Sequence, residues 1–131
     1  MAASDVESIS VSDLLAMSSA TDKQAFQDLW LGYTETFGNK ELRYEISKTY
    51  DTAKPEHILC FAGAEEGIYV AMRVLLRHND HAIIVVPNYQ AAETIPLDIC
   101  EASGVPLNPE ENWSLDIDRI KNEICSNTKL I

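Results

Sequence analysis

The sequence predicts an α/β fold with an incomplete, mostly parallel sheet, and two features of the chain indicate it. Short apolar runs suited to buried strands alternate with segments whose apolar residues recur at helical spacing. Turn residues separate these segments, and no linker or internal repeat interrupts the order. Strands that alternate with helices along a chain pair in parallel, and the helices cover the sheet. The 131 residues fit a single domain.

Composition narrows the class of function. Hydrophobic residues make up 46% of the chain and charged residues 24%, which is typical of a globular protein. A net charge of −11 disfavours partners such as nucleic acid or an anionic membrane, because both bind Lys and Arg. The chain has no apolar run of about 20 residues and no secretory signal, so we expect neither a membrane span nor export. Three widely spaced cysteines fit reduced thiols in a cytoplasmic protein.

Helices are predicted over about residues 1–50. Ser12 and Thr21 are candidate N-caps of two helices, and the second is expected to stop near Gly32. Asn39 is predicted to cap a third helix with one apolar side. That side consists of Leu42, Ile46 and Tyr50. This part of the chain indicates no function by itself.

Strands and helices are predicted to alternate in the rest of the chain. The apolar runs 58–62 and 83–86 are expected to be neighbouring or near-neighbouring parallel strands, both buried. A helix follows the turn 63–67, and another is expected within 89–102, where Pro96 must start, kink or break it.

The last quarter of the chain predicts three further elements. Residues 105–107 suggest a short strand, and a helix is expected to begin near Asp116, with Ile117, Ile120 and Ile124 facing inward. Residues 128–131 suggest the opening of another strand. Because strands usually have about 5–6 residues, this ending favours a chain cut from something larger over a complete edge strand.

The turn Gly63-Ala64-Glu65-Glu66-Gly67 is a candidate anion site, since it lies between a predicted strand and a helix N-terminus. Free backbone N–H groups and the helix dipole favour a phosphate there, although such turns are often glycine-rich for packing alone. Tyr89 follows the next strand, where open α/β sheets place ligands, so its ring could stack on a planar cofactor or simply cover the strand end.

The histidines, tryptophans, acidic pairs and cysteines give weaker indications of a functional site. The three histidines show no metal-ligand spacing and are expected to face solvent, and the tryptophans Trp30 and Trp113 are expected in a core or an interface. The pair Glu65-Glu66 is expected to be solvated. Cys60, in a predicted buried strand, is a poor nucleophile. We therefore predict no metal site and no catalytic residue in these 131 residues.

Five segments of the chain occur in the order and spacing of a known family. They begin with Tyr33-Thr34-Glu35-Thr36-Phe37-Gly38 and Gly63-Ala64-Glu65-Glu66-Gly67, and continue with Pro87-Asn88-Tyr89, 113–118 and 128–131. Together they resemble the first part of a class I/II aminotransferase, a fold type I transferase that depends on pyridoxal 5′-phosphate (PLP). The resemblance covers about three quarters of the chain, from about residue 29 onward.

The resemblance implies PLP-binding roles for five residues. Gly63, Ala64 and Glu65 would hold the cofactor phosphate, mainly through backbone N–H groups, and Tyr89 would stack on the pyridine ring. Tyr33 would reach the phosphate of the neighbouring subunit, since the family is usually a homodimer. The implied substrates are an amino acid and a 2-oxo acid. The implied domain is 1–131, truncated, with a helical segment over about 1–50 and the first half of the large domain over about 51–131.

Several family features are absent from the sequence. They are the Asn-Pro-x-Asn-Pro-Thr-Gly stretch, the Asp that pairs with the pyridine nitrogen, the Schiff-base lysine and the arginine that binds the substrate carboxylate. The chain alone is therefore expected to be an inactive N-terminal fragment. Two alternatives stay open: another fold type I PLP enzyme, such as a β-lyase or a decarboxylase, and a non-catalytic fragment that only associates with a full-length subunit.

Overall fold

The computed structural model describes residues 6–131, and the chain divides into two units, Met1–Thr36 and Phe37–Ile131. The described part of the first unit contains two short helices, α1 Val11–Met17 and α2 Ala20–Gln27. None of the described residues of these two helices is buried.

Both helices of the first unit begin two residues earlier than predicted. Ser10 and Ser19, not Ser12 and Thr21, accept a hydrogen bond from a first-turn N–H group. Several hydroxyl side chains near each start compete for the cap, and the sequence alone does not rank them. The second helix ends at Gln27, well before the predicted stop near Gly32.

From Ala64 onward, the second unit alternates helices and strands as predicted. Its helices and strands are α3 Lys40–Ser47, α4 Ala64–Leu75, β1 His81–Val86, α5 Gln90–Ile99, β2 Glu101–Pro106, α6 Ile117–Glu123 and β3 Thr128–Leu130. Two 3-10 turns, η1 Pro55–His57 and η2 Pro109–Glu111, lie between them. Asn39 caps α3 as the sequence predicts, and α6 begins just after Asp116 as expected; both residues cap through a side-chain oxygen.

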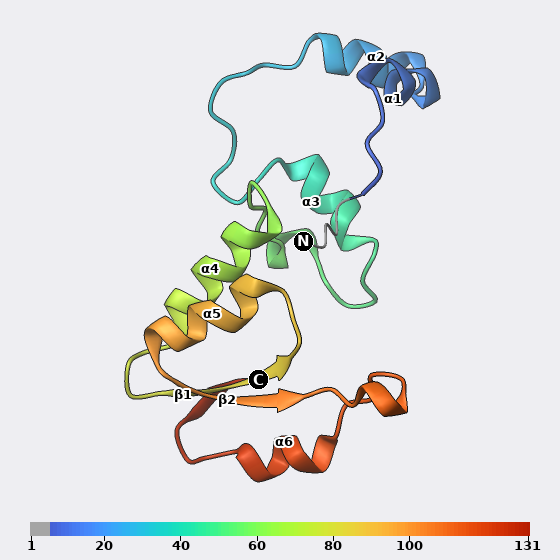
Figure 1. Ribbon diagram of the computed structural model, residues 1–131. Coiled ribbons are helices and arrows are strands. Elements are labelled where there is room, and N and C mark those ends of the chain that lie inside the picture. The colour runs from blue at the N-terminus through green and yellow to red at the C-terminus, as the bar shows by residue number, and fades with distance from the viewer. Residues whose placement is uncertain (1–5) are drawn as a thin grey trace. The chain divides into compact units, whose positions relative to one another are not determined.

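The three strands form a parallel sheet in the order β2-β1-β3, so the α/β class is confirmed. β1 and β2 pair over six residues in a regular register, with Val85 opposite Val105. Figure 1 shows α4 and α5 on one face of this sheet and α6 on the other. The covered strand β1 supplies half of the buried hydrophobic residues, and its first four residues are all buried. The buried hydrophobic residues are Leu76, Ala82, Ile83, Ile84, Ala91 and Val105.

The predicted strand at 58–62 is wrong. This segment lies outside the sheet in an extended path before α4, and Leu59 and Phe61 are exposed. An apolar run becomes a strand only where a neighbouring strand satisfies its backbone groups. Here the amides of the segment bond to the Pro55 carbonyl, the Phe37 carbonyl and the Glu66 carboxylate, none of which belongs to the sheet.

The elements after β1 differ from the prediction in detail. α5 continues through Pro96, whose side chain is fully buried, rather than starting or breaking there. β2 begins at Glu101, four residues before the predicted strand, and ends with Pro106. The inward orientation predicted for Ile117 and Ile124 is wrong, because both side chains are about half exposed. Since α6 has only seven residues and packs mainly on β2, it covers little apolar surface.

Of the two places predicted for the tryptophans, a core or an interface, the core is excluded. Trp30 is 85% exposed and Trp113 is 55% exposed, so neither is a core residue of the described structure. Trp113 follows Asn112 in a turn where both residues adopt positive φ angles, 53° and 58°.

His81 is buried, which corrects the prediction that all three histidines face solvent; His57 and His78 are exposed as predicted. Its ring lies at the start of β1 and bridges both neighbouring strands. Nδ1 is 2.9 Å from the Thr128 hydroxyl and Nε2 is 3.0 Å from the Ser103 hydroxyl. An imidazole satisfied on both sides is compatible with burial. His81 therefore fastens the three strands to one another at one end of the sheet.

Replacing His81 with alanine is expected to lower the free energy of unfolding by about 1–3 kcal/mol, because two part-buried hydroxyls lose their partner. Ser103→Ala breaks only one of the two bonds and serves as the control, with an expected loss of about 1 kcal/mol. Urea unfolding followed by circular dichroism measures both. A His81→Ala loss no greater than that of Ser103→Ala would contradict the bridging role.

Candidate functional site

The turn before α4 has a backbone shape that favours glycine. Gly63 is the N-cap of this helix, with φ 135° and ψ 150°, a region that other residues rarely adopt. A Cβ atom built on Gly63 meets nothing within 4 Å, so open space lies beside this backbone. The helix itself has 12 residues and starts at Ala64.

The first backbone N–H groups of α4 are free donors. Within residues 6–131, no hydrogen bond is found from the amides of Ala64 or Glu65. The Gly67 amide, two residues after Glu65, bonds within the turn to the Gly63 carbonyl at 3.4 Å. Free amides at a helix N-terminus carry a partial positive charge and bind anions. The turn therefore retains the donors that an anionic group would need.

The Glu66 side chain accepts a hydrogen bond from an amide just before the turn. Its carboxylate accepts a hydrogen bond from the Ala62 amide at 2.9 Å. A glutamate at the third helical position that reaches back in this way stabilises the helix start, much as in a capping box. Glu66 is thus a structural part of the turn and not merely a solvated charge.

Tyr89 is held at the end of β1 by its neighbours. The Asn88 side-chain oxygen accepts from the Tyr89 amide at 2.7 Å, and Glu93 accepts from the Asn88 amide at 2.6 Å. These bonds fix the backbone just before α5. The Tyr89 ring itself is 51% exposed, so packing alone does not immobilise it.

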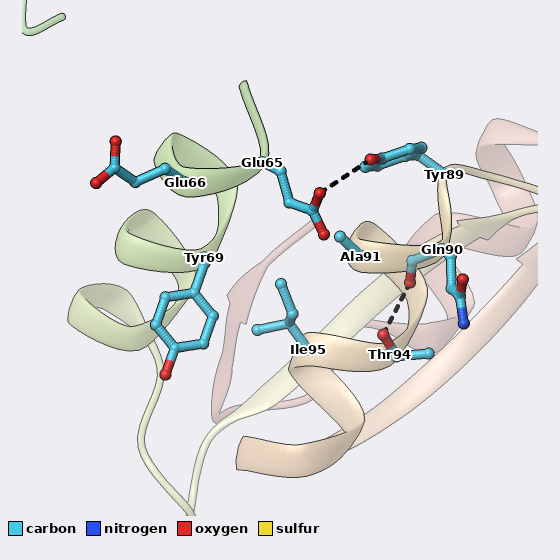
Figure 2. Close-up of a pocket in the computed structure, with 8 residues that line it drawn as sticks. All are labelled: Glu65, Glu66, Tyr69, Tyr89, Gln90, Ala91, Thr94 and Ile95. Carbon is cyan, nitrogen blue, oxygen red and sulfur yellow. Dashed lines mark hydrogen bonds between the residues drawn. The ribbon is translucent and has the colours of Figure 1, made fainter. Parts of the chain in front are cut away.

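The side chains of Glu65 and Tyr89 meet across the gap between α4 and α5. The Tyr89 hydroxyl donates a hydrogen bond to Glu65 Oε2 over 3.3 Å. Figure 2 shows the Glu65 carboxylate turned toward the Tyr89 hydroxyl, whereas the Glu66 side chain points away from α5. The negative charge of Glu65 disfavours the phenolate and raises the pKa of Tyr89. The hydroxyl thus remains protonated and able to donate at neutral pH.

Glu65 and Tyr89 line one pocket of about 530 Å³. This volume lies within the roughly 300–1,000 Å³ of small-molecule sites. The other lining residues are Glu66, Tyr69, Gln90, Ala91, Thr94 and Ile95. Gly63 and Ala64 line an adjoining pocket of about 460 Å³, together with apolar residues of α3 and of the segment 58–61. The turn thus borders two pockets, and of the three predicted phosphate-binding residues Gly63, Ala64 and Glu65, only Glu65 shares a pocket with Tyr89.

The remaining predicted site residue, Tyr33, lies in the first unit with a fully exposed side chain. Sequence reasoning did not include Tyr69, although it lies one helical turn after Glu65, a spacing that places both on one face of α4. Gln90 and Thr94 line the pocket from α5, and neither belongs to a sequence motif that could have indicated this. Their contribution follows from the packing of α5 beside α4.

Other chemistries find little support in the part of the chain that the structure describes. It contains no group of three or more His, Cys, Asp or Glu residues placed to hold a metal ion. Cys60, Cys100 and Cys125 are free, and burial raises the pKa of the Cys100 thiol, which disfavours the reactive thiolate. Across residues 6–131, no helix has the length and apolar character needed to cross a membrane.

The residues present fit a phosphorylated, planar ligand such as PLP. Free amides and open space at Gly63 suit the phosphate, and the half-exposed Tyr89 ring suits a planar face. The carboxylates of Glu65 and Glu66 oppose a dianion by charge. However, both are held by hydrogen bonds, to Tyr89 and to Ala62 respectively.

Comparisons with known proteins agree with this geometry. The family model described as "Aminotransferase class I and II" matches residues 10–131. The chain is 30% identical over 115 residues to an aspartate aminotransferase of Pyrococcus horikoshii, covering 83% of the chain and 29% of that relative. It is 28% identical to a histidinol-phosphate aminotransferase of Aliivibrio fischeri, covering 79% of the chain and 35% of the relative.

Solved structures show the same fold. A PLP-dependent aminotransferase from Streptococcus suis superposes with a TM-score of 0.83 at 26% identity, covering 92% of the chain and 33% of that structure. An aspartate aminotransferase of Thermus thermophilus superposes with a TM-score of 0.73 at 21% identity, covering 82% of the chain and 30% of that structure. The chain thus spans about a third of the length of the proteins it matches.

Proposed function

This chain belongs to the class I and II aminotransferase family, and from that premise we propose that it forms the N-terminal part of a PLP-dependent aminotransferase. One observation carries the proposal. The free amides at the start of α4 and the Tyr89 ring lie close enough for Glu65 and Tyr89 to share a hydrogen bond and a pocket. A phosphate and an attached ring need such a pairing of anion donors and aromatic surface.

The proposed roles follow from the chemistry of each group. The amides of Ala64 and Glu65 bind the phosphate, and Gly63 lets the phosphate approach the backbone closely. Tyr89 stacks on the cofactor ring and orients it. When bound, PLP supplies the electron sink for passing an amino group from an amino acid to a 2-oxo acid.

The wider assignment is also a proposal. We propose that about 1–50 is the N-terminal helical segment and about 51–131 the first half of the large domain. The intact enzyme is proposed to be a cytoplasmic homodimer in which Tyr33 reaches the phosphate of the neighbouring subunit. Many large apolar side chains, including Trp30 and Leu31, are exposed and available for such an interface. Sedimentation of the intact protein tests this, and a stable monomer with full PLP affinity would contradict it.

The phosphate role is tested by removing one amide. Ala64→Pro deletes the N–H group at the first helical position, where proline is tolerated because no intrahelical bond is lost. The affinity for PLP is expected to fall about tenfold, since hydrogen bonds to charged groups are strong. Affinity for pyridoxal, which lacks the phosphate, should not change. Equilibrium dialysis against both compounds measures the difference.

Ile117→Pro is the matched control, because it places proline at the same position of α6, on the other face of the sheet. It should leave the affinity for PLP unchanged. The 131 residues alone are expected to show no aldimine absorbance band that survives dialysis. Equal affinity of the unmodified protein for PLP and pyridoxal, or an Ala64→Pro variant that binds PLP normally, would overturn the phosphate assignment.

A further inference from the structure

Resting on the proposed function, we propose that Glu65 is a positioning residue whose side chain fixes the Tyr89 ring as a wall of the cofactor pocket. One residue would then serve the site twice. Its backbone N–H group would bind the phosphate, and its carboxylate would hold the aromatic ring. The positioning role belongs to the Glu65 carboxylate and is separate from the contact of the Glu65 backbone N–H group with the phosphate.

The geometry that carries the inference is a single contact between two elements. Glu65 lies on the first turn of α4, and Tyr89 immediately precedes α5, 24 residues later in the chain. Their hydrogen bond spans 3.3 Å. The Tyr89 backbone is fixed by Asn88, but its half-exposed ring retains rotational freedom. Among the described residues, Glu65 is the one found to bond the Tyr89 hydroxyl, so it limits that freedom.

The arrangement also directs the negative charge of Glu65. A carboxylate near the axis of α4 would compete with the phosphate for the free amides. In this structure the Glu65 carboxylate is turned toward the Tyr89 hydroxyl, which donates to it (Figure 2). The same contact raises the pKa of Tyr89, so the donor stays protonated. Glu66 is engaged separately by the Ala62 amide.

The first test measures the ionisation of Tyr89 in the intact polypeptide without any ligand. Tyrosine absorbance is followed against pH, and the difference between the unmodified protein and Tyr89→Phe isolates the Tyr89 transition. Glu65→Gln removes the neighbouring charge, so this transition is expected at lower pH. Glu66→Gln removes a charge from the same helical turn but not from the Tyr89 hydroxyl, and should leave the transition in place. Equal effects of both variants would overturn the inference.

The second test measures PLP affinity by equilibrium dialysis. Glu65→Ala removes the acceptor and is expected to weaken binding about two- to tenfold, the range of one hydrogen bond. Glu65→Gln keeps an acceptor and should restore the affinity. In a Tyr89→Phe background, the Glu65→Ala and Glu65→Gln variants should bind PLP equally, because the acceptor acts through the hydroxyl. A weaker affinity of Glu65→Ala than of Glu65→Gln that persists in this background would overturn the positioning role.

The two proposals fail in different ways. If the unmodified protein binds no PLP, the proposed function is overturned, and the tyrosine titration still decides whether Glu65 positions Tyr89. If PLP binds and Glu65→Gln leaves the Tyr89 transition unchanged, the positioning role is overturned and the proposed function is retained.

Discussion

Val105→Asp is expected to unfold the Phe37–Ile131 unit. Val105 is fully buried in β2 and lies opposite Val85 of β1. No cationic residue occurs in β1 or β2 to pair with a new carboxylate, apart from His81 at the far end of the strand. An unpaired buried charge costs about 3–5 kcal/mol. Because domains are stable by only about 5–15 kcal/mol, this loss removes much or all of the stability.

The control is Val74→Asp, which makes the same chemical change on α4 at a side chain that is 75% exposed. It should cost less than about 1 kcal/mol, as surface substitutions usually do. Circular dichroism during urea or thermal unfolding compares the two variants. If Val105→Asp unfolds at the same urea concentration as Val74→Asp, β2 does not occupy the core position described above.

Gly38→Ala is expected to cost about 3–5 kcal/mol, for two reasons that add. Gly38 has φ 99°, which strains any residue with a Cβ atom. That Cβ atom would also lie 2.6 Å from Cys60 Cβ and 2.8 Å from Cys60 Sγ. The backbones of Cys60 and Gly38 do not move apart easily. The Cys60 amide donates to the Phe37 carbonyl at 3.0 Å, and the Gly38 carbonyl accepts from Arg43 at 3.0 Å.

Gly63→Ala separates backbone strain from the collision with Cys60. Gly63 also has a positive φ, but a Cβ atom there meets nothing within 4 Å. Its cost should therefore reflect backbone strain alone, about 1–3 kcal/mol. The second substitution Cys60→Gly removes the atoms that collide with the methyl group introduced by Gly38→Ala, and it should recover part of that loss. Equal losses for the two glycine variants in urea unfolding would show that the contact with Cys60 contributes nothing.

Local patterns predicted much of the fold. Asn39 is confirmed as a cap, and the start of a helix near Asp116 is confirmed, because a helix start depends on only a few neighbouring residues. The buried strand β1 is confirmed because residues 83–86 have the composition of a strand covered on both faces. Residues 58–62 have the same composition, yet they form no strand. The difference lies in what pairs with each segment, which composition does not encode.

The local geometry of the candidate site was predictable from the sequence, but the arrangement of its parts was not. Gly63, Ala64 and Glu65 were identified from a turn before a helix, and Tyr89 from its place after a strand. The contact between Glu65 and Tyr89 depends on how α4 and α5 pack, which no local spacing reveals. His81 was predicted to face solvent because it lies at the end of a predicted element. The hydroxyls that satisfy it come from residues 22 and 47 positions away.

These separations bear on the order in which the sheet assembles. His81 reaches Ser103 across 22 residues and Thr128 across 47. Closing the longer loop costs about 0.7 kcal/mol more chain entropy. The pairing of β1 with β2 is also the longer one, with six residues in register, while β3 joins through two. Assembly is therefore favoured to begin with β1, α5 and β2. The strand β3 then docks onto the free edge of β1.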